Sequence, residues 1–168
     1  LLQNFAAFVC LGEDENPELR ANQLIDLFYR QMDSYSDYIS PILKYSDIEN
    51  NRKNNKISAM LTLEEGGVVF DDLAMLRNYY RLGVRMITLT WNFYNGIAYP
   101  NVNSSRNNDL LNVTKLPNTK EGLTVFGIKY IQEMEKRATE IDKRKVRLSR
   151  NITKNLISDL DKIFAEVQ

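Results

Sequence analysis

Two adjacent carboxylates, Glu64 and Glu65, end an apolar run and are followed at once by Gly66 and Gly67. The run, LTLEEGG, has the pattern of a buried strand that finishes on acidic residues. The glycines allow close backbone approach and unusual dihedral angles at that point. A carboxylate placed there can bind a divalent cation or act as a general base. A solvated polar turn is the alternative interpretation, and the pattern alone leaves both open.

The composition narrows the chemistry that this chain can perform. It has no histidine among its 168 residues, and histidine is the commonest metal ligand and the usual general base near neutral pH. Ser-His-Asp catalysis and the usual zinc sites are therefore excluded for this chain by itself. Any chemistry must rest on carboxylates, amines or hydroxyls.

Charge and apolar content restrict the partners and the compartment. Lys and Arg total 22 and Asp and Glu total 22, so nothing favours nucleic acid or an anionic membrane as a partner. No apolar run approaches the ~20 residues of a spanning helix, and the apolar start lacks the basic flank of a secretion signal. The one cysteine, Cys10, cannot form an internal disulfide. We expect a cytoplasmic protein without a membrane span or a nucleic-acid partner.

Apolar patterns along the chain predict alternating strands and helices. Runs typical of strands buried on both faces cover residues 4–10, 57–63 and 84–90. Amphipathic or capped segments predict helices over residues 17–38, 46–53, 72–82, 123–141 and 153–167. Gly83 is expected to end one helix in the left-handed conformation.

The helical periodicity also predicts which side chains face the core. In two of the predicted helices the inward residues are expected to be Leu73, Leu76, Tyr80 and Leu82, and Val125, Ile128, Ile131 and Met134. Ser46 is expected to cap the helix that starts there, because Glu49 follows it at capping-box spacing.

The order of elements predicts the α/β class, with a parallel sheet and helices packed outside it. A complete (β/α) TIM-type barrel needs about 250 residues, so the chain has the material for roughly half of one, or for a small open sheet. We expect a partial barrel domain over residues 1–141 and a basic linker with a C-terminal helix over 142–168. Residues 96–122 read as a loop.

Functional groups of parallel α/β folds lie at the carboxyl ends of the strands. That rule selects Cys10 with the acidic loop 13–15, then Glu64 and Glu65, then Trp91 and Asn92. Glu65 is the strongest candidate of these, since it follows a buried strand directly and precedes the glycine pair.

Several blocks of this sequence resemble the membrane (renal-type) dipeptidase family of zinc peptidases. In order they are EGG at 65–67, YRLGVR at 80–85, ITLT at 87–90 and GLTVFG at 122–127. The opening LQNFAAFV is similar to a preceding barrel strand of that family, so the likeness covers about residues 1–136. Another metal-dependent barrel hydrolase is an alternative that shares a strand-end glutamate but does not predict this spacing.

The resemblance implies roughly half of a metallohydrolase barrel that cleaves dipeptides with two zinc ions and a bridging water. Glu65 falls on the family's metal-bridging glutamate. Trp91 falls where some members have a histidine that contacts substrate, and with Asn92 it is expected to line the substrate pocket. No residue of the chain is assigned as catalytic.

The family takes its other metal ligands from a His-x-Asp motif on the first strand and from histidines on later strands. We expect this chain to begin after the first of these, and it has no histidine to supply the rest. Since a catalytic zinc needs about three protein ligands, the hypothesis is a partial or degenerate family member that is inactive alone. The alternative is a non-catalytic scaffold that binds partners, or forms a homodimer, through exposed strand edges and apolar helix faces.

Overall fold

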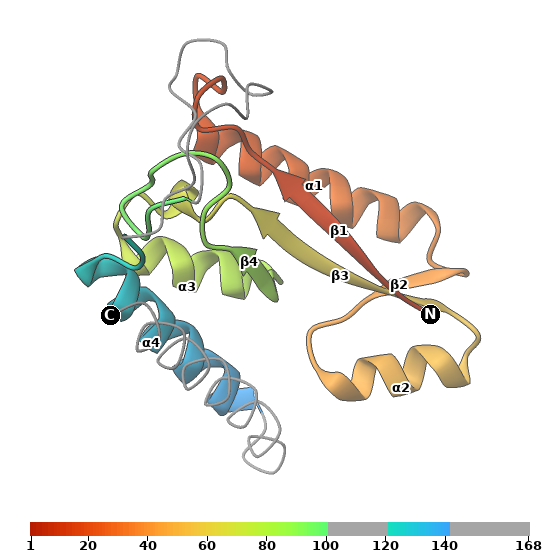
Figure 1. Ribbon diagram of the computed structural model, residues 1–168. Coiled ribbons are helices and arrows are strands. Elements are labelled where there is room, and N and C mark those ends of the chain that lie inside the picture. The colour runs from red at the N-terminus through yellow and green to blue at the C-terminus, as the bar shows by residue number, and fades with distance from the viewer. Residues whose placement is uncertain (101–120, 142–168) are drawn as a thin grey trace. The chain divides into compact units, whose positions relative to one another are not determined.

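The structure is a computed structural model that describes residues 1–100 and 121–141, with side chains to residue 137 (Figure 1). The chain divides into two compact units, Leu1–Tyr130 and Ile131–Gln168. The boundary between the units falls inside one helix, and the fold given below is that of the first unit.

A parallel sheet forms the centre of this unit (Figure 1). Strand β3 (Ile57–Glu64) lies in the middle and pairs along one edge with β1 (Leu2–Phe8). Its other edge pairs with β2 (Ile39–Pro41) near its start and with β4 (Met86–Thr88) near its end. The α/β class with a parallel sheet, predicted from the sequence, is confirmed.

Helices connect these strands. They are α1 (Pro17–Ser34), α2 (Tyr45–Lys53), α3 (Leu73–Arg81) and α4 (Val125–Ile141), with a short 3-10 helix η1 (Gly66–Val69) after β3. Helix α1 packs on β1 and β3, and the residues that it buries are Ala21, Ile25, Phe28 and Met32. Among the described residues, no helix combines the length and the apolarity needed to cross a bilayer.

Side-chain caps begin two of the helices where the sequence chemistry favours a start. Asn16 Oδ1 accepts the Leu19 N–H at 2.9 Å at the beginning of α1, and Asp72 Oδ1 accepts the Ala74 N–H at 2.7 Å at the beginning of α3. Each bond satisfies an N–H that has no partner inside its helix. Gly83 follows α3 with φ +97°, as predicted.

Strand β3 supplies the centre of the core, because it has neighbours on both edges. Its Ala59, Leu61 and Leu63 are buried, and burying each leucine contributes about 1.5–3 kcal/mol. Those three residues share one face, and Ser58 and Thr62 on the opposite face are buried too. The prediction that both faces of this strand are buried is confirmed.

The same prediction is wrong for the flanking strands. Strand β1 starts at Leu2 rather than Asn4, and its Leu2 and Phe8 are 45% and 39% exposed. Strand β4 covers only Met86–Thr88 of the predicted 84–90, and Met86 is exposed. The physical reason is position: among the described residues both strands pair only with β3, so their outer sides lack a neighbour.

One strand was not predicted, and one predicted cap is wrong. Strand β2 has only three residues, one of them Pro41, and proline is tolerated in a sheet mainly at an edge. Helix α2 starts at Tyr45, and Asp47 rather than Ser46 makes the cap: its Oδ2 accepts the N–H groups of Leu43 at 2.9 Å and Lys44 at 3.0 Å.

The predicted inward face of α3 is partly wrong. Leu76 is buried as expected, but Tyr79 occupies the buried position expected for Tyr80, and Leu82 is exposed. The inward face of α3 is therefore the one that carries Leu76 and Tyr79, so the aromatic ring that enters the core is that of Tyr79.

The predicted inward stripe of α4 is also wrong at its start. Val125 and Ile128 are 75% and 49% exposed, whereas Gly127 and Tyr130 are buried. The reason is a close backbone approach: a Cβ on Gly127 would lie 2.0 Å from the carbonyl oxygen of Ile97. The helix face that carries Gly127 therefore packs inward, and the apolar side chains of Val125 and Ile128 remain exposed.

Several predictions lie outside the described residues. These are the basic linker and C-terminal helix of residues 142–168 and most of the predicted loop 96–122. The domain boundary at residue 141 stays a prediction.

Candidate functional site

The site is built around Glu65, which follows β3 directly at the carboxyl end of the central strand. Its exposed fraction is 0%, and its backbone has φ +105° and ψ +97°. Positive φ favours glycine, so a glutamate in this region costs about 1–3 kcal/mol and persists only where its surroundings hold it. Strained residues of this kind cluster at functional sites.

Three neutral donors hold the Glu65 carboxylate. Oε1 accepts the Gly67 N–H at 2.8 Å and a hydrogen bond from Asn95 Nδ2. Oε2 accepts the Trp91 N–H at 3.2 Å. A buried carboxylate is tolerable only when such donors replace water, and bonds to a charged acceptor are among the strong ones.

Asn95 connects the carboxylate to the segment after β4. Its Nδ2 donates both to Glu65 Oε1 and, at 2.6 Å, to the carbonyl oxygen of Leu89. Its Oδ1 accepts the N–H groups of Ile97 at 3.1 Å and Ala98 at 3.4 Å. All the polar atoms of this side chain are therefore engaged. Sequence reasoning missed Asn95; the available signal was an asparagine just after a strand end and directly before Gly96.

The glycine pair serves close packing and not unusual dihedrals, which corrects the sequence interpretation. The positive φ belongs to Glu65, while positive φ among the described glycines occurs at Gly83 and Gly96. A Cβ on Gly66 would lie 2.8 Å from the Leu89 carbonyl oxygen. A Cβ on Gly67 would lie 2.6 Å from Asn95 Cβ. Both glycines thus let η1 approach the segment that follows β4.

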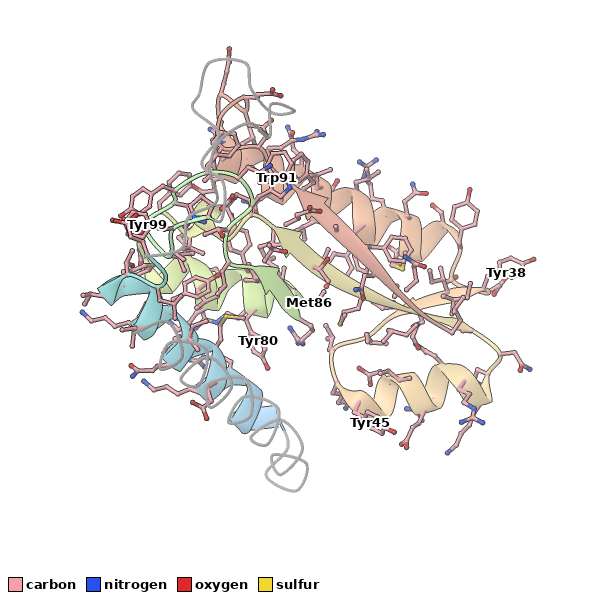
Figure 2. All side chains as sticks on the ribbon, in the orientation of Figure 1. Tyr38, Tyr45, Tyr80, Met86, Trp91 and Tyr99 are labelled. Atoms are coloured by element: carbon pink, nitrogen blue, oxygen red, sulfur yellow. The ribbon has the colours of Figure 1, made fainter. Side chains whose placement is uncertain are left out.

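Trp91 lies beside the carboxyl end of β1 (Figure 2). Its ring makes an edge contact with Phe8 at a centroid distance of 5.2 Å and a tilted contact with Phe93 at 6.0 Å. Its backbone reaches Glu65, so the structure brings these two predicted residues together through the main chain. Asn92 follows in the same segment and is half-buried.

Two buried tyrosines near this site were not predicted as site residues. The hydroxyls of Tyr79 and Tyr130 are buried and have no hydrogen-bond partner among the described residues. Burial raises the pKa of Tyr79 to about 12, with a smaller contribution from Glu18. Burial also raises the pKa of Tyr130 above its usual range, and the negative charge of Glu65 adds to that shift.

The other predicted strand-end residues form a local turn. Cys10 is buried, and its backbone N–H donates to Asp14 Oδ2 at 2.8 Å. Within residues 1–100 and the described part of 121–141, no three His, Cys, Asp or Glu side chains come together as a group that could bind a metal ion.

The residues of this chain do not fit the two-zinc centre that the resemblance implies. Among the described strand-end carboxylates Glu65 is fully buried, and both of its oxygens already accept protein hydrogen bonds. A catalytic zinc needs about three protein ligands, and the chain has no histidine. A zinc centre at Glu65 would require ligands from outside this sequence.

Comparison with known proteins shows which family the sequence matches. The sequence matches the family described as Membrane dipeptidase over residues 2–147. It is 29% identical over 140 residues to Dipeptidase 3 of Homo sapiens, covering 82% of this chain and 26% of that protein. It is 29% identical over 141 residues to Dipeptidase 3 of Mus musculus, covering 83% and 26%. The chain thus spans about a quarter of the length of these relatives.

Solved structures show the same fold at lower identity. The probable dipeptidase PvdM from Pseudomonas aeruginosa has a TM-score of 0.65 at 14% identity, covering 80% of this chain and 34% of that one. A dipeptidase described as a metallopeptidase has a TM-score of 0.64 at 16% identity, covering 80% and 40%. An amidohydrolase from Pseudomonas aeruginosa has a TM-score of 0.62 at 16% identity, covering 80% and 35%.

These neighbours are (β/α) barrels, and the chain covers 34–40% of each, so the prediction of a partial TIM-type barrel is confirmed. The family match extends over most of the sequence and includes Glu65 and the segment after β4. The chain belongs to the membrane dipeptidase family of metallopeptidases.

Proposed function

We propose that this chain carries the glutamate-bearing part of a metalloenzyme that hydrolyses dipeptides, with Glu65 as a metal ligand. The observation that supports this most directly is the placement of Glu65. It is fully buried, strained and hydrogen-bonded at the carboxyl end of the central strand of a membrane dipeptidase family chain. In a (β/α) barrel that end is the face where catalytic groups gather.

The remaining ligands of a two-zinc centre would come from outside this sequence. We therefore expect the chain alone to show no dipeptide hydrolysis, because one carboxylate cannot hold two metal ions. The direct test is incubation of the purified chain with zinc and a dipeptide, with a Glu65→Gln variant as control. Hydrolysis by the chain that is lost in the variant, with a thermal melt verifying that the variant is folded, would overturn the inactivity and support the role of Glu65. Hydrolysis that survives in the variant would overturn that role.

Trp91 and Asn92 are proposed to contact the dipeptide. Both are half-buried and follow β4, whose carboxyl end lies beside that of β3 and therefore near Glu65. Trp91 is the one tryptophan of the sequence, so its fluorescence reports on this segment alone. A saturable change on adding a dipeptide, weakened in Asn92→Ala, is the expected result. A dipeptide that leaves the emission unchanged at millimolar concentration would argue against this assignment.

A non-catalytic scaffold is the second candidate function. It is favoured by the exposed β1, whose Leu2 and Phe8 are partly solvent-accessible in a strand without a charged residue. Such an edge is prone to pair with another chain. Mass measurement by size-exclusion chromatography separates the two candidates: a homodimer that forms equally with and without zinc supports the scaffold, and zinc-dependent compaction supports a metal site.

A further inference from the structure

The side chain of Asn95 makes hydrogen bonds of two kinds on its two sides. Nδ2 faces two acceptors, the Glu65 carboxylate and the Leu89 carbonyl, while Oδ1 faces two donors, the N–H groups of Ile97 and Ala98. The amide orientation is thereby determined by its surroundings, since the reverse orientation would set donor against donor and acceptor against acceptor. An amide is the only side chain of this size and shape that can satisfy all four partners.

We propose that Asn95 is the positioning residue for Glu65: its Nδ2 fixes the direction of the carboxylate at the carboxyl end of β3. The two backbone donors, from Gly67 and Trp91, contact one oxygen each and lie on different segments. Asn95 bonds Oε1 and at the same time the Leu89 carbonyl, so it ties the carboxylate to the chain that leaves β4. The benefit to a metal site rests on the proposed function, but the positioning itself does not.

The packing around Asn95 supports a dedicated role. A Cβ on Gly67 would lie 2.6 Å from Asn95 Cβ, so the smallest residue lies opposite it. A Cβ on Gly96 would collide with the Asp71 carboxylate, and Gly96 has φ +78°. The backbone after Asn95 thus turns in a way that glycine favours, and this turn directs its side chain towards Glu65. Glutamine carries the same amide on a longer stem, so it cannot reach the same position without displacing these neighbours.

Substitutions at Asn95 can test the donor side and the acceptor side of its amide separately. Asn95→Asp retains an oxygen that accepts from Ile97 and Ala98, but it replaces the two donors of Nδ2 by an acceptor beside Glu65 Oε1. Two carboxylates then face each other, and Glu65 is expected to turn away. Asn95→Leu removes both sides at similar volume. Asn50→Asp makes the same chemical change at an exposed position of α2 and serves as the matched control.

The experiment records ¹H–¹⁵N spectra of the full chain and of each variant, with a thermal melt to verify folding. In folded Asn95→Asp, the amide signals of Gly67 and Trp91 should move upfield, and their hydrogen exchange should accelerate at least about 10-fold through loss of a bond to a charged acceptor. The Trp91 emission should shift with them, and Asn50→Asp should match the unmodified chain. If either Asn95 variant folds with both amides unchanged, the proposal is overturned.

If neither Asn95 variant folds, the unmodified chain itself provides the test of the proposal. Its Asn95 side-chain N–H signals should exchange with solvent at least about 10-fold more slowly than those of an exposed asparagine, because both protons are bonded. Exchange at the rate of a free amide would overturn the proposal. None of these measurements uses zinc or substrate, so failure of the proposed function would leave them unaffected.

Discussion

The side-chain amide of Asn95 donates a hydrogen bond to the buried carboxylate of Glu65 across 30 positions of sequence. The two residues meet because β3 and β4 are parallel and end together, with Glu64 opposite Thr88. The segments that leave the two strands therefore emerge at one edge of the sheet. A negative charge is thus buried among neutral donors, and this arrangement leads to the first prediction.

Glu65→Gln should destabilise the fold strongly. Both carboxylate oxygens face N–H donors, so the glutamine amide group opposes a donor in either orientation. We expect a loss of about 2–4 kcal/mol in the free energy of unfolding, measured by urea titration. The control is Glu64→Gln, which changes the neighbouring half-buried carboxylate and should stay within about 0.5 kcal/mol. Equal stability of both variants would contradict the hydrogen bonding described for Glu65.

Tyr130→Phe should not destabilise the chain at neutral pH. In the described part of the chain the buried Tyr130 hydroxyl has no hydrogen-bond partner, so removing it relieves a desolvation cost of about 1–3 kcal/mol while the ring is retained. We expect stability equal to or above that of the unmodified chain in urea unfolding. Tyr38→Phe, at a tyrosine that is 71% exposed, provides the reference. A loss above about 1 kcal/mol at Tyr130 would show that its hydroxyl has a partner.

Stability should decline at alkaline pH because of the buried phenols. The pKa of Tyr79 is raised to about 12 by burial, against about 10 in the unfolded chain. Between pH 10 and 12 the unfolded chain therefore releases a proton that the folded chain retains, and stability falls by about 1.4 kcal/mol per pH unit. Below pH 10 both states keep the proton, so this tyrosine adds no slope. Urea titrations from pH 8 to 11.5 should show a shallower decline in Tyr79→Phe than in Tyr38→Phe.

Gly127→Ala should destabilise the fold although alanine favours helices. A Cβ at this position would lie 2.0 Å from the Ile97 carbonyl oxygen, and overpacking against backbone costs about 1–3 kcal/mol. Because the obstacle is a backbone carbonyl rather than a flexible side chain, we expect a cost in the upper part of that range, above the propensity gain of about 1 kcal/mol. Gly122→Ala, just before α4, is the control, since among the described residues nothing lies within 4 Å of the Cβ that it would add. Urea unfolding that ranks the two variants equally would contradict the close approach of α4 to Ile97.

Much of the architecture followed from the sequence because local chemistry determines it. The apolar run of β3 and the stop at Gly83 both depend on a few neighbouring residues. Where burial depends on residues that are distant in the sequence, the same patterns gave wrong predictions. Strand β1 is as apolar as a buried strand, yet among the described residues it has a neighbour on one side only.

The sequence by itself determined the α/β class, the family blocks and the choice of Glu65 at the end of β3. Those features depend on the types and short spacings of neighbouring residues, so hydrophobic periodicity and turn residues predict them directly. Only the tertiary structure decided that Glu65 is strained and fully buried, that Tyr79 and Tyr130 lie nearby, and that Asn95 holds the carboxylate. These relationships join segments tens of residues apart through the parallel pairing of β3 and β4. No local sequence pattern shows which of the asparagines that follow a strand will lie next to the Glu65 carboxylate, because the pairing of β3 and β4 decides it.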